Sequence, residues 1–124
     1  MESIVVNGIH CHWDFKLLPD DFIAITLFGH VFFNTSKKKM QSYLLSERGA
    51  ITLNHERIHI LQANTFKTKW LGFYVYYLWY WVLGLFRHGT KDNKSYYNIP
   101  FEREAEYNEE NFDYNKSDWK KYIY

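Results

Sequence analysis

Hydrophobic and polar residues alternate in short runs over roughly the first 45 residues. Residues 4–6 and residues 24–28, a run that 31–33 continue, are rich in β-branched and aromatic side chains, which favour strands. Asn7-Gly8 and the segment 19–21 (Pro-Asp-Asp) separate these runs and are typical of turns. The pattern predicts a small N-terminal antiparallel sheet of two to four strands.

From about residue 50 the hydrophobic period becomes that of an α-helix. Residues 46–48 are polar, Gly49 or Thr52 could mark a helix start, and no proline interrupts the segment that follows. We expect a helix over residues 50–65. The positions that recur at helical spacing are Ile51, His55, Ile58, His59, Leu61 and Gln62.

The segment 70–86 is uncharged and mostly aromatic or aliphatic. Cations flank it on both sides: Lys67 and Lys69 before it, and Arg87 with Lys91 after it. As a helix it would extend about 25 Å, slightly less than a bilayer span requires. Two interpretations stay open, a core helix or a helix in the membrane interface, where Trp, Tyr and cations are favoured. We expect a core helix with an exposed aromatic face that promotes membrane contact or self-association.

A further helix is expected to begin near Pro100, because proline suits a first turn and the carboxylates after it complement the helix N-terminus. The tail 108–124 is expected to dock through its aromatic residues as a short helix, or to fray. Apolar residues make up 47% and aromatic residues 21% of 124 residues, enough for one core. The predicted fold is therefore a single α+β domain over 1–124, a sheet followed by about three helices.

The motif His55-Glu56-Arg57-Ile58-His59 carries the candidate chemistry. Positions i and i+4 lie on the same face of a helix, so both imidazoles can reach one metal ion. Glu56 lies beside them and can take a proton from a water that the metal activates. A catalytic zinc site needs a third protein ligand, and the carboxylates after Pro100 are the candidates.

This arrangement resembles the gluzincin metallopeptidases, and more closely their small minigluzincin-type members. These proteins carry a helical H-E-x-x-H followed by a second helix with E-x-x-A-D or E-x-x-A-N, which Glu102 and Ala105 match. The resemblance implies a zincin-like fold with the motif on the first long helix. It also implies Zn²⁺ held by His55, His59 and Glu102, and a peptide or protein substrate beside an edge strand, for which 24–33 is the candidate.

The sequence departs from the family pattern at Glu106, where an Asp or Asn is usual. The longer Glu106 side chain could still accept a hydrogen bond from a zinc-bound histidine. The departure also leaves Glu104 and Glu106 as alternatives to Glu102 for the third ligand. A single membrane crossing by 70–86 would separate the histidines from all these carboxylates, so zinc binding and such a crossing exclude each other.

The function predicted from the motif and the resemblance is a zinc-dependent metallohydrolase, most simply a peptidase, with Glu56 as general base. His88 and Tyr107 are weak candidates for stabilising an oxyanion, because each can donate a hydrogen bond. The alternative is a catalytically silent zinc-bound module that binds a peptide or a membrane protein. A further alternative is a small membrane protein in which the motif is accidental.

The remaining observations concern the partners of the protein, its location and a possible second metal site. A net charge of +1 is no nucleic-acid signature. Cys11 is the only cysteine, and residues 1–3 do not read as a secretory signal, so we expect a cytoplasmic protein, membrane-associated through 70–86 or forming a homo-oligomer. His10 and His12 would share one face of a strand, but nothing in the sequence completes a second metal site.

Overall fold

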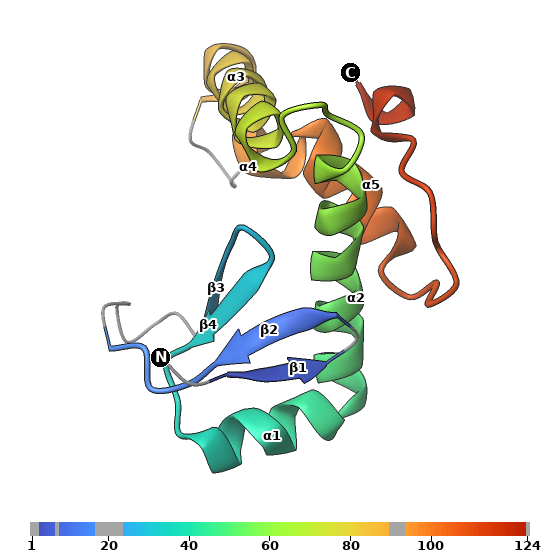
Figure 1. Cartoon of the computed structure of the whole chain (residues 1–124). Coiled ribbons are helices and arrows are strands. Elements are labelled where there is room, and N and C mark those ends of the chain that lie inside the picture. Colours follow the sequence, from blue (N-terminus) through green and yellow to red (C-terminus); the bar gives the residue numbers. More distant parts are fainter. Residues whose placement is uncertain (1–2, 7, 17–23, 90–93, 124) are drawn as a thin grey trace. The chain divides into compact units, whose positions relative to one another are not determined.

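A computed structural model describes residues 3–6, 8–16, 24–89 and 94–123, and it places a sheet ahead of a series of helices (Figure 1). The predicted α+β class is confirmed, and two short helices, α1 and α4, add to the three that were predicted. Contacts group the chain into two compact units, Met1–Arg57 and Ile58–Tyr124, so a single domain stays a prediction. The elements are β1 (Ile4–Val6), β2 (Ile9–His12), β3 (Ala24–Leu27), β4 (His30–Phe33), α1 (Lys37–Leu45), α2 (Glu47–Ala63), α3 (Trp70–His88), α4 (Lys94–Tyr97), α5 (Pro100–Asn108) and the 3-10 helix η2 (Trp119–Tyr122).

The sheet has the strand order β1-β2-β4-β3. β1 pairs with β2 and β3 pairs with β4 in antiparallel fashion, whereas β2 and β4 run parallel. The prediction of a wholly antiparallel sheet was therefore wrong. The two hairpins follow from local turn signals, but the long connection between β2 and β3 lets β4 reach β2 in the same direction. The predicted turn at 19–21 lies outside the described residues.

Alternate residues of the two central strands form the core of the first unit. Ile9 and Cys11 of β2 and Val31 and Phe33 of β4 are buried, as the two-residue period of a strand requires. Burial raises the pKa of the Cys11 thiol to about 11, so this side chain behaves as a small apolar core residue. This face of the sheet is therefore buried on the two central strands and partly buried on the outer strands β1 and β3.

The basic segment 37–39 forms the first turn of α1. Ser36 is the N-cap, and its hydroxyl accepts a hydrogen bond from the Lys39 backbone N–H. Three consecutive lysines are more typical of a solvated loop, but the Ser36 cap makes this segment the start of a helix. Tyr43 of α1 contacts both β4 and α2. Its ring meets the Phe33 ring of β4 edge-on, and its hydroxyl lies 2.8 Å from the Thr52 hydroxyl of α2.

A sharp corner between α1 and α2 sets the start of the motif helix. Ser46 caps α1, and Gly49 lies so close to the preceding chain that a Cβ there would fall 1.9 Å from the Tyr43 carbonyl oxygen. The observed bounds of α2 lie within three residues of the predicted 50–65. The prediction that the motif lies within a helix is confirmed.

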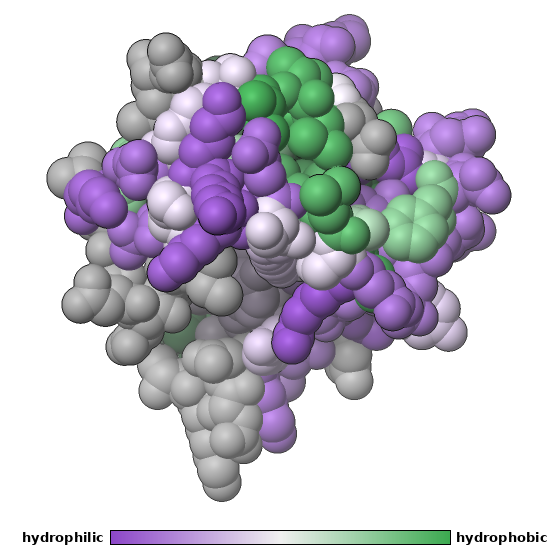
Figure 2. Space-filling view, turned by 90° about the horizontal axis from the view of Figure 1, so that it is seen from below, coloured by the Kyte–Doolittle hydropathy of each residue, from purple (hydrophilic) through white to green (hydrophobic). Residues whose placement is uncertain are grey.

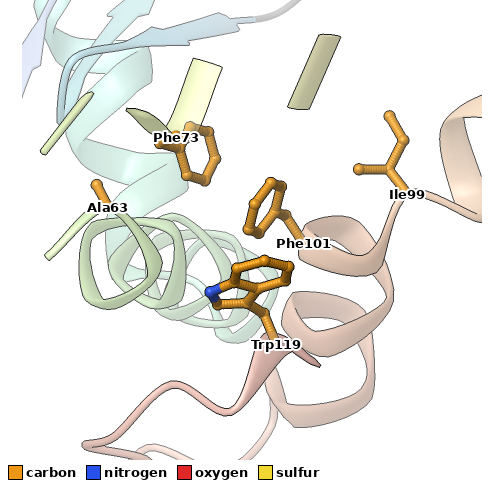
Figure 3. Close-up of a cluster of buried hydrophobic side chains, with 5 residues drawn as sticks. All are labelled: Ala63, Phe73, Ile99, Phe101 and Trp119. Carbon is orange, nitrogen blue, oxygen red and sulfur yellow. The ribbon is translucent and has the colours of Figure 1, made fainter. Parts of the chain in front are cut away.

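The core of the second unit is built mainly from aromatic rings (Figure 3). The Phe101 ring lies 4.8 Å from both the Phe73 and the Trp119 ring, centroid to centroid. Trp119 belongs to η2, so the expectation that the tail docks through an aromatic side chain is confirmed. Ala63 and Ile99 complete this buried cluster.

Hydrophobic side chains also reach the surface. On the face shown in Figure 2, hydrophobic residues gather in a patch with hydrophilic residues around it. Within the described part of the chain, no helix combines the length and the apolar character that crossing a membrane requires.

Replacing Gly49 with alanine tests the α1–α2 corner. Helix propensity alone predicts that Gly49→Ala stabilises the protein by up to about 1 kcal/mol. The clash with the Tyr43 carbonyl predicts the opposite sign, a loss of about 2 kcal/mol in the free energy of unfolding. Urea denaturation followed by circular dichroism measures the difference, with Ala50→Gly as the control for propensity. A more stable Gly49→Ala variant would contradict the tight corner.

Candidate metal centre

Two helices bring three metal-ligating side chains together. His55 and His59 project from α2 one turn apart, and Glu102 projects from the first turn of α5, which begins at Pro100. One ligand atom of each side chain lies within 4.8 Å of the other two. The His59 Nε2 and Glu102 Oε1 atoms are 3.2 Å apart, in side chains whose residues are only 7% and 4% exposed. The sequence prediction thus named the three residues that converge.

Gln62 determines which nitrogen of His59 faces this cluster. The Gln62 Nε2 atom lies 2.8 Å from both the Phe101 carbonyl oxygen and a carboxylate oxygen of Glu104. An amide nitrogen donates both bonds, so the Gln62 Oε1 atom is left as the acceptor for His59 Nδ1, 2.8 Å away. His59 therefore carries a hydrogen on Nδ1. In the neutral ring, the Nε2 lone pair then points toward Glu102 and is available to a metal ion.

Glu104 holds the Gln62 amide in this orientation. It is completely buried, and besides Gln62 it accepts hydrogen bonds from the Tyr114 hydroxyl at 2.6 Å and the Ser117 hydroxyl at 2.7 Å. The backbone N–H of Asp118 donates a further bond. Four donors thus engage the two oxygens of Glu104, which lies outside the ligand cluster. Its role is to hold Gln62 and the C-terminal tail, and Glu102 supplies the carboxylate beside the histidines.

Tyr77 engages the second oxygen of Glu102. Its hydroxyl donates to Glu102 Oε2 at 2.5 Å, while Oε1 faces His59. Burial, reinforced by the adjacent Glu102 carboxylate, raises the pKa of Tyr77 well above its usual value, so the hydroxyl keeps its proton and remains a donor. Sequence reasoning gave Tyr77 no role at the metal site. The available signal was the three-residue spacing of Tyr74, Tyr77 and Tyr80.

Two more predicted residues lie on the same helices as the ligands. Glu56 follows His55 on α2 and is partly exposed, as a base that must meet water requires. Glu106 is exposed on α5, one turn beyond Glu102 and on the same side of that helix. Its predicted hydrogen bond to a zinc-bound histidine stays a prediction.

The structure does not bring the two oxyanion candidates to the ligands. His88 ends α3, roughly 16 Å along the helix axis from Tyr77. There it lines a cavity of about 120 Å³ with Arg87 and Asn98. Tyr107 is 83% exposed, and its ring packs against Tyr122. A role for either side chain in oxyanion stabilisation has no support from these positions.

His30 lies beside His10 and His12, a contact that the sequence did not predict. The His30 ring stacks on His10 with 4.7 Å between centroids, and its Nδ1 atom lies 2.9 Å from His12 Nε2. Burial, followed by the neighbouring His10 and His12, lowers the pKa of His30. Stacked rings direct their lone pairs along nearly parallel planes rather than toward one point, so this trio does not have the geometry of a metal site.

The chemistry of the converging residues fits Zn²⁺. Two imidazoles and one carboxylate are a ligand set of catalytic zinc sites, in which one position stays open for water or substrate. The His59 tautomer and the Tyr77 bond to Glu102 are the kind of supporting hydrogen bonds that orient zinc ligands. His55, His59 and Glu102 would hold the ion.

Comparison of the chain with protein-family models, with curated proteins and with solved structures gives no match.

The role assigned to Gln62 can be tested by removing its amide. Gln62→Leu keeps a side chain of similar size but loses the acceptor for His59 Nδ1. We expect zinc affinity to fall by about 10- to 100-fold, the usual effect of losing such a partner. Competition with a chromophoric chelator measures the affinity, and circular dichroism verifies that the variant is folded. The matched control is Gln41→Leu on the exposed side of α1. Equal affinity in the parent and Gln62→Leu would contradict the tautomer argument.

Proposed function

We propose that this protein is a zinc-dependent hydrolase, most simply a peptidase. The observation that carries the proposal is the convergence of His55, His59 and Glu102, which contribute ligand atoms within 4.8 Å of one another. The position of these residues in an H-E-x-x-H helix and a following E-x-x-A helix supports the peptidase reaction through the resemblance to gluzincins. Zinc bound there would supply Lewis-acid activation of a water molecule.

The residues of the chain have separate tasks in this proposal. Glu56 accepts a proton from the attacking water and returns it to the leaving amine. This role requires that Glu56 contact solvent, and it does not require Glu56 to ligate the metal. Gln62 keeps His59 in the tautomer that leaves Nε2 available. Tyr77 orients Glu102 and provides a buried hydroxyl donor beside the ligands.

The test combines zinc content with hydrolysis of a quenched fluorescent peptide library. We expect about one zinc ion per chain in the parent and in Glu56→Gln, because Glu56 is not a ligand. Hydrolysis should fall by at least about 100-fold in Glu56→Gln, since loss of a general base typically costs that much. Glu102→Gln and His59→Ala should lose most of the zinc, whereas the exposed carboxylate variant Glu110→Gln should retain it.

Three outcomes would contradict the proposal in different ways. Zinc in the parent without hydrolysis of any peptide would reject the enzyme and leave a zinc-bound interaction module. Equal hydrolysis by the parent and Glu56→Gln would reject Glu56 as the general base. No zinc in the parent after reconstitution would reject the metal site itself.

A further inference from the structure

One side of α3 presents apolar side chains to the surroundings along its whole length. The exposed positions follow the spacing of a single helical stripe, at i, i+4, i+7, i+8 and i+15. The last of them is 86% exposed. We name this stripe the outer face of α3; it consists of Leu71, Val75, Leu78, Trp79 and Phe86.

The opposite side of α3 is more polar than the outer face. Tyr77 and Tyr80 are partly buried against the core, and the Tyr77 hydroxyl donates to Glu102. A helix whose outer face met only water would place aliphatic residues inward and tyrosines outward. In α3 three of the four tyrosines pack toward the core beside Phe73 and only Tyr76 is exposed, whereas three aliphatic residues, Leu71, Val75 and Leu78, face away from the protein. This inversion indicates that the outer face meets an apolar medium.

The charges at the ends of α3 identify that medium. Exposed Lys67 and Lys69 precede the helix and exposed Arg87 ends it, while the segment 67–91 contains no Asp or Glu. If two copies paired through this face, parallel helices would bring like ends together and antiparallel helices would bring Lys69 near Arg87 of the other copy. Either arrangement places cations beside cations, which is unfavourable. Anionic lipid headgroups are complementary to both ends at once.

We propose that the outer face of α3 docks on the surface of an anionic lipid bilayer, with the helix axis in the plane of the interface. The outer side chains enter the acyl boundary, while the terminal cations remain among the headgroups. Trp79 and the partly exposed Trp81 suit this depth, since tryptophan is favoured at membrane interfaces. The proposal does not depend on zinc or on hydrolysis, because it uses the side of α3 that faces away from Glu102.

Sedimentation of the full chain with vesicles tests the proposal. We expect the protein to pellet with phosphatidylcholine vesicles that contain 30% phosphatidylserine, and much less with phosphatidylcholine alone. Leu78→Gln should lower the vesicle–water partition coefficient of the protein roughly tenfold or more, because it removes one of the leucines that would enter the acyl boundary. Leu45→Gln is the matched control, since Leu45 is 90% exposed on α1. Lys67→Gln with Lys69→Gln should reduce binding to the anionic vesicles.

The same experiment can overturn the proposal. Absence of binding to anionic vesicles would reject it, as would an equal loss of binding in Leu78→Gln and Leu45→Gln. A concentration-dependent dimer in light scattering that Leu78→Gln abolishes would assign the face to a second copy instead. His59→Ala should bind vesicles like the parent, so failure of the zinc site and failure of membrane docking give different results.

Discussion

The side-chain amide of Gln62 is the interaction on which the candidate site depends. It donates to the Phe101 carbonyl and to Glu104, and its oxygen accepts from His59 Nδ1. Because the Phe101 carbonyl oxygen can only accept, the orientation of the amide and the tautomer of His59 are fixed together. The bonds join α2 to α5, the two helices that carry the histidines and Glu102.

Burial makes this network cooperative. Gln62 and Glu104 are both completely buried, so any hydrogen bond lost there leaves a polar group unsatisfied in the interior. Glu104 also holds Tyr114, Ser117 and the backbone of residue 118, which place η2 against the aromatic core. The C-terminal tail, far from the motif in sequence, thereby supports His59 of the candidate site. Folding of the tail and orientation of His59 are therefore coupled.

The convergence of His55, His59 and Glu102 could be predicted from the sequence because local geometry places two of them. His55 and His59 share a helix face by spacing alone, and Glu102 was chosen by resemblance to a motif. The bonds from Gln62 to residues of α5 and the other bonds of Glu104 could not be predicted, since each of them joins positions at least ten residues apart. The prediction of an antiparallel sheet failed for the same reason: the hairpins are local, but the parallel contact of β2 with β4 is not. The start of α1 at Lys37 does have a local signal, the Ser36 cap, but the three lysines that follow are more typical of a loop.

The most direct measurement of the central claim is the protonation of the His59 ring by ¹⁵N–¹H NMR in the zinc-loaded protein, assigned with His59→Ala. We expect the hydrogen on Nδ1, hydrogen-bonded to Gln62, and the zinc on Nε2. The same hydrogen should exchange with water faster in Gln62→Leu. A ring that carries its hydrogen on Nε2, or binds zinc through Nδ1, would contradict the orientation that Gln62 and Glu104 are inferred to impose.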